Sequence, residues 1–234
     1  MKDSSCSVRC AAFVGPQGAG KTTLVRALLK RAGSAGPSLD AGDEAKEFGT
    51  TTDPNFARGD YLGEPWVFID CPGSVELAQA SFEAMAAADI AIVVAPPEPE
   101  RAASLAPYFK FLDDRKIPHA LFVNRVDEAN ARIRDVMEAL QAASTRPLVL
   151  RQAPIREGET IVGAGDLVSE RAWKYREGKQ AELIEIPDDE TLLREAEARE
   201  AMLDALADFD DALMEQILED KIPPSETIFE VMKK

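Results

Sequence analysis

Short apolar runs alternate with segments of helical periodicity through the first 145 residues of the chain. Runs typical of buried strands lie at Val8–Val14, Trp66–Ile69, Asp89–Ala95 and His119–Val123. Segments with a helical spacing of apolar residues lie at Leu24–Lys30, Val75–Ala88 and Glu98–Asp114. Strands that alternate with helices predict an α/β fold, in which a mostly parallel sheet is flanked by helices.

In two of these helices, apolar residues recur on one face. In the first, Leu24 and Leu28 lie one turn apart, and the last carries Leu105, Tyr108, Phe109 and Leu112. The connections are predicted as well. Residues 32–48, rich in Gly, Ser, Ala and acidic residues, predict a mobile loop, and Tyr61–Trp66 predicts a hairpin turn.

The pattern changes after residue 145. Turn signals at Arg156–Glu159 and Arg176–Lys179 separate short apolar strands, and a long helical stretch follows from Asp188 to Asp220. The apolar stripe of that stretch consists of Leu192, Ala196, Leu203, Leu206, Leu213 and Ile217. We expect this stripe to face a core, and a groove that binds a partner is the alternative.

Composition narrows the class of protein. The chain has 234 residues, 45% of them hydrophobic, and a formal net charge of −15. So acidic a chain repels nucleic acid at long range, but its charge does not exclude one local contact on a large ribonucleoprotein. Cys6, Cys10 and Cys71 are too few and too scattered for a disulfide framework or a zinc site. No signal peptide or membrane span is evident, so we expect a cytoplasmic, reduced, soluble monomer.

The first motif with a chemical meaning follows the first strand. Gly15-Pro16-Gln17-Gly18-Ala19-Gly20-Lys21-Thr22 fits the pattern of a phosphate-binding loop between a strand and a helix. Its amides and the helix N-terminus attract phosphate. Lys21 can reach the β- and γ-phosphates, and the Thr22 hydroxyl can bind Mg²⁺. The residues expected to contact the nucleotide here are Gly15, Gln17, Gly18, Ala19, Gly20, Lys21, Thr22 and Thr23. An ordinary Gly-rich turn is the alternative.

Two further segments complete a phosphate and metal site. Gly49-Thr50-Thr51-Thr52 is either a segment of high strand propensity or a switch loop, in which the Thr51 hydroxyl meets Mg²⁺. The strand Trp66–Ile69 ends in Asp70-Cys71-Pro72-Gly73. A carboxylate there points into the crevice where parallel sheets bind ligands. We predict Thr22, Thr51 and Asp70 as the metal site, with the Gly73 amide on the γ-phosphate.

A fourth motif stands at the end of the strand His119–Val123. In Asn124-Arg125-Val126-Asp127, the Asp127 carboxylate can accept two hydrogen bonds from guanine, and adenine lacks that donor pair. Asn124 would tie this loop to the phosphate loop and the base. A polar strand exit is the alternative, but the order of the motifs along the chain favours guanine recognition.

Together the four motifs resemble those of the translational GTPases. Phe68–Ser74 and Phe122–Asp127 are similar to the third and fourth motifs of elongation factor G and its elongation factor G-like relatives. Arg146–Ile155, Asp166–Ser169, Ala172–Tyr175 and Ala207–Asp210 resemble the strands and a helical turn of the α+β subdomain inserted into that GTPase domain. The resemblance implies a GTPase core of the P-loop NTPase fold at residues 1–145 and the inserted subdomain at 146–234, with the final strand and helix of the GTPase domain missing.

The sequence departs from this family at three positions. Ser74 stands where the family has a histidine that positions the attacking water. Arg125 replaces a lysine whose stem lies along the base, and an arginine stem can pack there too. Gly18 replaces an aspartate, which puts in doubt any monovalent-cation site built on it.

The resemblance therefore implies a domain of protein biosynthesis that binds GTP or GDP with Mg²⁺ and hydrolyses GTP slowly or with a partner such as the ribosome. We assign no catalytic residue. A non-hydrolysing GTP-binding switch or regulatory module is the alternative, which Ser74 favours. A small-molecule kinase is a third reading, and Asn124 and Asp127 argue against it.

Overall fold

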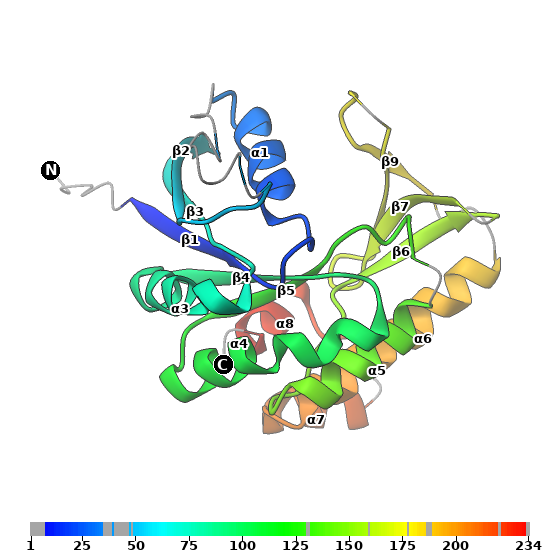
Figure 1. Ribbon diagram of the computed structural model, residues 1–234. Helices are drawn as coiled ribbons and strands as arrows, with labels where there is room; N and C mark the ends of the chain where they lie inside the picture. The colour runs from blue at the N-terminus through cyan, green and yellow to red at the C-terminus, as the bar shows by residue number, and fades with distance from the viewer. Residues whose placement is uncertain are drawn as a thin grey trace, which may run out of the picture. The chain divides into compact units, whose positions relative to one another are not determined.

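A computed structural model describes residues 8–34, 39, 47, 49–129, 132–158, 160–176, 178–185, 189–219 and 221–232 (Figure 1). The chain divides into two compact units, Met1–Arg146 and Pro147–Lys234. None of the helices in the described ranges is long and apolar enough to cross a membrane. Most of the loop expected at 32–48, together with Cys6, Glu159 and Glu177, lies outside the described residues.

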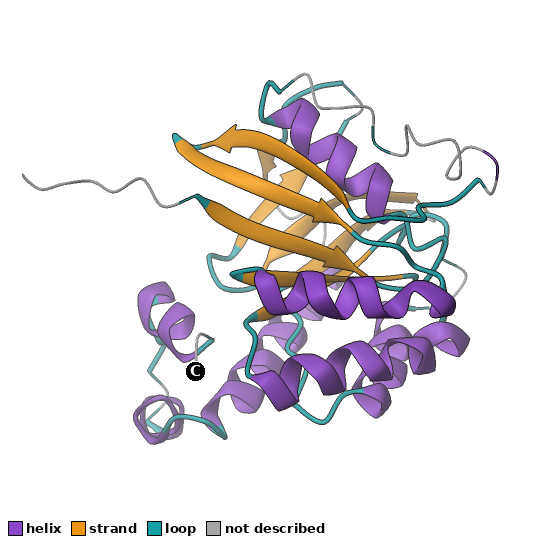
Figure 2. Cartoon of the chain, turned by 60° about the vertical axis from the view of Figure 1, so that its left-hand side comes forward, coloured by secondary structure: helices purple, strands orange, loops and turns teal. Residues whose placement is uncertain are grey.

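A five-stranded sheet forms the centre of the first unit (Figure 2). Its order is β2-β3-β1-β4-β5, with β1 at Arg9–Val14, β2 at Asn55–Tyr61, β3 at Glu64–Asp70, β4 at Ile90–Ala95 and β5 at His119–Val123. All neighbouring pairs are parallel except β2 with β3. The predicted α/β fold with a mostly parallel sheet is therefore confirmed, and the carboxyl ends of β1, β3, β4 and β5 meet at one edge.

The hairpin that joins β2 to β3 contains the turn expected from the sequence. Only Leu62 and Gly63 separate the two strands, and both have positive φ, 52° and 80°. Such a two-residue loop matches the twist of paired antiparallel strands. Strand β2 was not predicted, because it is an edge strand and most of its residues are only partly buried or exposed.

Helices cover both faces of this sheet. Figure 1 shows α1 (Lys21–Arg31) on one side and α3 (Ala78–Ala87) and α4 (Ala106–Arg115) on the other. The short 3₁₀ helices η1 (Val75–Leu77) and η2 (Pro99–Leu105) precede α3 and α4, and α5 (Ile133–Ala143) packs on η2. The apolar face expected on the helix predicted at Glu98–Asp114 is confirmed, since its four apolar residues are all buried.

The face expected for α1 is right at Leu24, which is half-buried and packs against the core, and wrong at Leu28. The helix buries Val25 and Leu29, whereas Leu28 is exposed. Lys21, Val25 and Leu29 follow one another at intervals of four residues, so they form a single line on the helix. The position of the phosphate loop orients Lys21 inward, and the rest of that line is buried with it.

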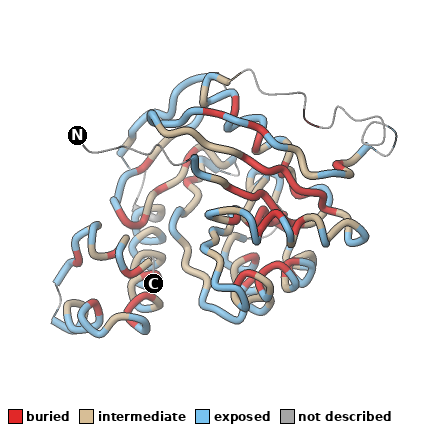
Figure 3. Tube along the Cα trace, turned by 90° about the vertical axis from the view of Figure 1, so that its left-hand side faces the viewer, coloured by how far each residue is buried: buried red, intermediate tan, exposed pale blue. Residues whose placement is uncertain are grey.

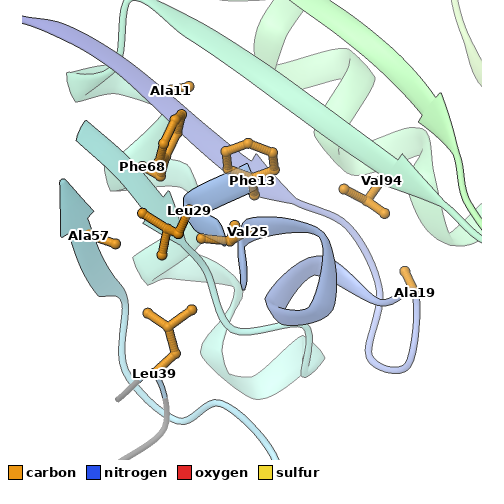
Figure 4. Packing of buried hydrophobic residues seen from close by; sticks show 9 residues of the cluster. All are labelled: Ala11, Phe13, Ala19, Val25, Leu29, Leu39, Ala57, Phe68 and Val94. Atoms are coloured by element: carbon orange, nitrogen blue, oxygen red, sulfur yellow. The ribbon is translucent and has the colours of Figure 1, made fainter. Parts of the chain in front are cut away.

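The core between α1 and the sheet is built from alanine, branched aliphatic and phenylalanine side chains (Figure 4). Phe13 of β1 and Phe68 of β3 meet edge to face, with ring centroids 6.0 Å apart. Figure 3 shows that buried positions gather along the central strands. Ala19 of the phosphate loop belongs to the same cluster. The phosphate loop is therefore anchored to the apolar core through Ala19.

In the described part of the second unit, a four-stranded antiparallel sheet is accompanied by three helices. The strands are β6 (Gln152–Glu157), β7 (Thr160–Asp166), β8 (Arg171–Lys174) and β9 (Glu182–Ile184), paired in chain order. The helices are α6 (Asp189–Ala207), α7 (Asp211–Leu218) and α8 (Ser225–Val231). The turn expected at Ala207–Asp210 is confirmed, and Asp210 caps α7 by accepting a 2.9 Å hydrogen bond from the Leu213 amide.

Two details of the second unit differ from expectation. Asp166 ends β7, and residues 167–170 form a turn rather than a strand, because the Asp166 carboxylate accepts hydrogen bonds from the amides of Val168 and Ser169. The helical stripe is only partly buried. Of its predicted members, Leu206 and Leu213 are buried, but Leu192 is 52% exposed. The amino-terminal half of the predicted stripe, including the exposed Ala196, is therefore not core.

Candidate functional site

The phosphate loop lies between the end of β1 and the start of α1, at the edge where the parallel strands end. Gly15 has a φ of 138°, and a Cβ there would overlap the carbonyl oxygen of Val94 in β4. Gly20 has a φ of 88°, and a Cβ there would overlap the side-chain amide of Asn124. Both positions therefore require glycine for conformation and for close approach. Gly18 and Gln17 are exposed, whereas Ala19 is buried.

Lys21 is buried, with 6% of its surface exposed. Its ammonium donates hydrogen bonds to the carbonyl oxygens of Gly15, at 2.9 Å, and Pro16, at 3.1 Å. A buried charge must be compensated by hydrogen bonds or by an opposite charge. The loop carbonyls hold the Lys21 ammonium at the loop.

Three oxygen-bearing side chains from α1, β3 and the loop before β2 meet beside Lys21. The Thr22 hydroxyl donates a 2.7 Å hydrogen bond to the Asp70 carboxylate and lies 3.3 Å from the Thr51 hydroxyl. Asp70 is fully buried at the end of β3, and Thr51 is 7% exposed. Hydroxyl and carboxylate oxygens are ligands that suit Mg²⁺. These three residues therefore fit a magnesium ion by chemistry and by position.

The loop after β3 contacts the phosphate loop through Gly73. The Gly73 carbonyl accepts a 2.9 Å hydrogen bond from the Gln17 amide. A Cβ at Gly73 would lie 2.5 Å from the Lys21 ammonium and 2.6 Å from the Gln17 nitrogen, so no larger residue fits. The next residue, Ser74, donates its hydroxyl hydrogen to the carboxylate of Glu76. That hydrogen bond lowers the pKa of Glu76.

The thiol of Cys71 lies directly after Asp70 and is fully buried. Burial, and secondarily the charge of Asp70, raise the pKa of Cys71 to about 12. A thiol with so high a pKa stays protonated and is a poor nucleophile. Cys71 therefore fills space under the site and supplies no reactive group.

The loop after β5 reaches the phosphate loop from the other side. The Asn124 amide donates a 2.8 Å hydrogen bond to the Ala19 carbonyl, and its backbone nitrogen bonds to Ala95 of β4. Arg125 has a φ of 56°, and its Nε lies 3.8 Å from the Cβ position of Gly20. Asp127 is exposed beyond it. Thr23, also predicted to contact the nucleotide, is exposed on α1.

One residue near this site was missed by the sequence analysis. Arg101 of η2 donates a 2.6 Å hydrogen bond from Nη2 to the Gln17 carbonyl. An isolated arginine in a 3₁₀ helix has no motif to mark it. The available signal was its position, six residues after β4 ends at the same edge as the other motifs.

Comparisons with known proteins fit this geometry. The family described as Elongation factor Tu GTP binding domain matches residues 7–222. The Elongation factor G-like protein of Synechocystis sp. is 41% identical over 231 residues, which are 95% of this chain and 34% of that protein. Elongation factor G 1 of Borreliella burgdorferi is 32% identical over 226 residues, or 90% of this chain and 32% of that protein. The chain thus spans about a third of the length of these curated relatives.

A solved structure resembles the chain over both units. A crystal structure of a Thermus thermophilus protein aligns with a TM-score of 0.83 and 25% identity, covering 97% of this chain and 35% of that one. The mitochondrial Ribosome-releasing factor 2 of Pongo abelii is 29% identical over 86% of this chain and 28% of that protein. The chain therefore belongs to the family described as Elongation factor Tu GTP binding domain.

Proposed function

We propose that this chain binds GTP or GDP together with Mg²⁺ at the edge where β1, β3 and β5 end. One observation carries the proposal. Hydrogen bonds join the phosphate loop to the loop after β3 and to the loop after β5. Three segments far apart in the sequence thus form one site with separate places for phosphates, metal and base.

The phosphate end of the site is built from the loop amides, the N-terminus of α1 and Lys21. The amides and the helix N-terminus bind anions, and Lys21 adds a full charge. Mg²⁺, when bound, neutralises charge on the β- and γ-phosphates. Thr22, Thr51 and Asp70 would hold it, since the Thr22 hydroxyl already lies within hydrogen-bond distance of an oxygen of each of the other two.

The base end of the site is assigned to the loop after β5. Asn124 fixes this loop to the phosphate loop, so the distance between base and phosphates is set by the fold. Asp127 would accept hydrogen bonds from guanine, and the stem of Arg125 would lie along the base. An adenine ring would leave the carboxylate without its donors, which costs binding free energy.

We propose that hydrolysis by the chain alone is slow or depends on a partner. The Ser74 hydroxyl is engaged by Glu76 and is short, so it orients an attacking water poorly. The same observation favours the second candidate, a GTP-binding switch that does not hydrolyse. Similarity to elongation factors and to a protein named for ribosome release suggests the ribosome as the partner. We further propose a cytoplasmic monomer whose residues 146–234 form the inserted subdomain.

A competition titration tests the nucleotide assignment. The fluorescent GDP analogue mant-GDP is bound to the chain in the presence of Mg²⁺, and GDP, GTP, ADP and ATP compete for it. We expect displacement by both guanine nucleotides and none by ADP or ATP at a hundredfold excess. Chelation of Mg²⁺ should weaken the binding of GTP. Equal competition by ATP would contradict the base assignment, and an absence of mant-GDP binding would contradict the proposed function.

A further inference from the structure

Arg101 places a second cation beside the phosphate loop. It lies in η2, which follows β4, and β4 pairs with β1 up to the start of the loop. Its neighbours Ala102 and Leu105 are buried at 4% and 0% exposure, so η2 is anchored in the core. The guanidinium is therefore presented from a fixed element.

The contact that Arg101 makes is with the residue at the centre of the loop. Gln17 donates its amide hydrogen to the Gly73 carbonyl and accepts the Arg101 hydrogen bond at its own carbonyl. The Cβ position of Gly73 is in turn 2.5 Å from the Lys21 ammonium. Arg101 thus contacts Gln17, and Gln17 contacts Gly73, which is expected to meet the last phosphate of GTP.

Stability alone is a weak explanation of this arrangement. The pair between Arg101 and Glu98 has a separation of 3.8 Å and is partly exposed, and such pairs contribute little. The guanidinium has five donors, and 39% of the side-chain surface is exposed. Donors therefore remain for a ligand. A planar guanidinium also suits phosphate oxygens, which it binds two at a time.

The charge of the chain adds a reason for a second cation. The formal net charge is −15, which repels a nucleotide at long range. A triphosphate brings one more negative charge than a diphosphate, at the end where Gly73 and Gln17 meet. A local cation at this end would offset the extra repulsion, and it would do so for GTP more than for GDP.

We infer that Arg101 contacts the γ-phosphate of bound GTP and stabilises the charge that develops there during hydrolysis. This inference rests on the proposed function. In the reaction, a water oxygen bonds to the γ-phosphorus as the bond to the bridging oxygen breaks. The electron pair of that bond goes to the β-phosphate oxygen, and the products are GDP, inorganic phosphate and one proton. Arg101 keeps its own protons and donates only hydrogen bonds, as an arginine supplied within the same chain.

The test compares binding of the triphosphate and the diphosphate. Wild type and Arg101→Ala are titrated with GTPγS and with GDP, and each is assayed for the complex of GDP with aluminium fluoride, which mimics the transferred phosphoryl group. For Arg101→Ala we expect GTPγS affinity to fall about tenfold, GDP affinity to change less than twofold, and the aluminium fluoride complex to be lost. Guanidinium chloride at millimolar concentration should restore part of that complex.

Two variants control for charge and for structure. Arg58→Ala removes the same charge from an exposed position of β2 and should change neither affinity. Glu98→Gln removes the competing carboxylate and should leave GTPγS binding at least as tight as in wild type. Thermal unfolding confirms that each variant is folded.

The outcomes separate this inference from the proposed function. If Arg101 only braces the loop through Gln17, its removal will weaken GTPγS and GDP equally, and the inference is overturned. Unchanged affinities and an intact aluminium fluoride complex in Arg101→Ala would overturn it too. Failure of the wild type to bind either guanine nucleotide would instead overturn the proposed function.

Discussion

The hydroxyl of Ser74 donates a hydrogen bond to the carboxylate of Glu76, two residues further along the chain. Ser74 follows Gly73, whose carbonyl is bonded to the phosphate loop, so the serine stands next to the expected γ-phosphate position. Because its single proton is already donated, the side chain offers an incoming water only lone pairs. The relationship bears directly on catalysis.

We predict that GTP hydrolysis by the isolated chain is very slow and that Ser74→His accelerates it. Losing a group that orients or deprotonates the water costs roughly 10²–10⁴-fold. An imidazole is longer than a hydroxyl and can both donate and accept a proton. Single-turnover hydrolysis of GTP at saturating Mg²⁺ measures the effect, without and with ribosomes.

Two further variants make that comparison sharp. Gln17→Ala tests the amide side chain that the phosphate loop itself carries, and we expect little change because this side chain is exposed. Glu76→Gln weakens the partner of Ser74 without altering the backbone. Rapid turnover by the wild type would refute the prediction, and a large loss in Gln17→Ala would transfer the role to the phosphate loop.

Base specificity gives a second prediction, centred on Asp127. In Asp127→Asn, the side-chain amide can donate to the oxygen that xanthine carries in place of the guanine amine. We expect weaker GDP binding and stronger XDP binding, with a combined change of about 10²-fold, since two hydrogen bonds to a charged group are altered. Titration with GDP, XDP and ADP measures it, and Glu128→Gln is a control of equal charge. Wild-type affinity for ADP equal to that for GDP would exclude the assignment.

Much of this architecture follows from the sequence because buried parallel strands are continuously apolar. β1, β3, β4 and β5 were predicted near their observed bounds for that reason. The edge strand β2 was missed because its composition is not that of a buried strand. The helix face of α1 was misassigned at Leu28 because Leu28 fits the periodicity as well as Val25, and only the inward orientation of Lys21 distinguishes the two.

The candidate site was likewise predicted only in part from the sequence. Its motifs were found because the residues of each motif lie close together in the sequence at a fixed spacing, and because parallel strands bring their carboxyl ends together. The meeting of Thr22 with Asp70 was therefore expectable. Arg101 was not, because its contact with Gln17 spans 84 positions and depends on how η2 packs. The engagement of Ser74 by Glu76 also needs side-chain positions that no pattern supplies.

A third prediction distinguishes charge contacts from metal contacts in the phosphate site. Lys21→Ala should weaken the binding of GDP by roughly 1.5–3 kcal/mol with or without Mg²⁺, because a charged hydrogen bond to phosphate is lost. Thr22→Ala should weaken binding mainly when Mg²⁺ is present, since Thr22 acts through the metal. Titrations of GDP at several Mg²⁺ concentrations separate the two effects.

The control for this series lies in the neighbouring loop. Thr51→Ala should resemble Thr22→Ala when GTPγS is the ligand, because the Thr51 hydroxyl lies 3.3 Å from that of Thr22. Thr52 instead bonds to Asp53, and Thr52→Ala should behave as wild type. An unchanged Mg²⁺ dependence in Thr22→Ala would remove that residue from the metal site.

The last prediction concerns the stability of the second unit and the carboxyl group of Glu195. One of its oxygens is buried without a hydrogen-bond partner among the described residues, against Gly165 of β7. Burial raises the pKa of Glu195 above its usual range. The neutral form is therefore favoured in the folded state. As pH rises from the ordinary glutamate pKa through the raised one, the unfolded state loses its proton first, so stability falls across that window.

Glu195→Gln removes this titration and keeps the shape of the side chain. We expect the variant to be more stable than wild type at pH 7, with a free energy of unfolding higher by at most about 1 kcal/mol because the group is partly solvated. At pH 3 the two proteins should unfold alike, since the wild-type carboxyl is then neutral in both states. Trp173 fluorescence in a Trp66→Phe background reports the second unit alone, because those are the chain's two tryptophans. Glu197→Gln, an exposed position on the same helix, controls for the change in net charge. If Glu195→Gln destabilises at pH 7, the carboxylate must have a favourable ionic partner, and the assignment of a desolvated acid is wrong.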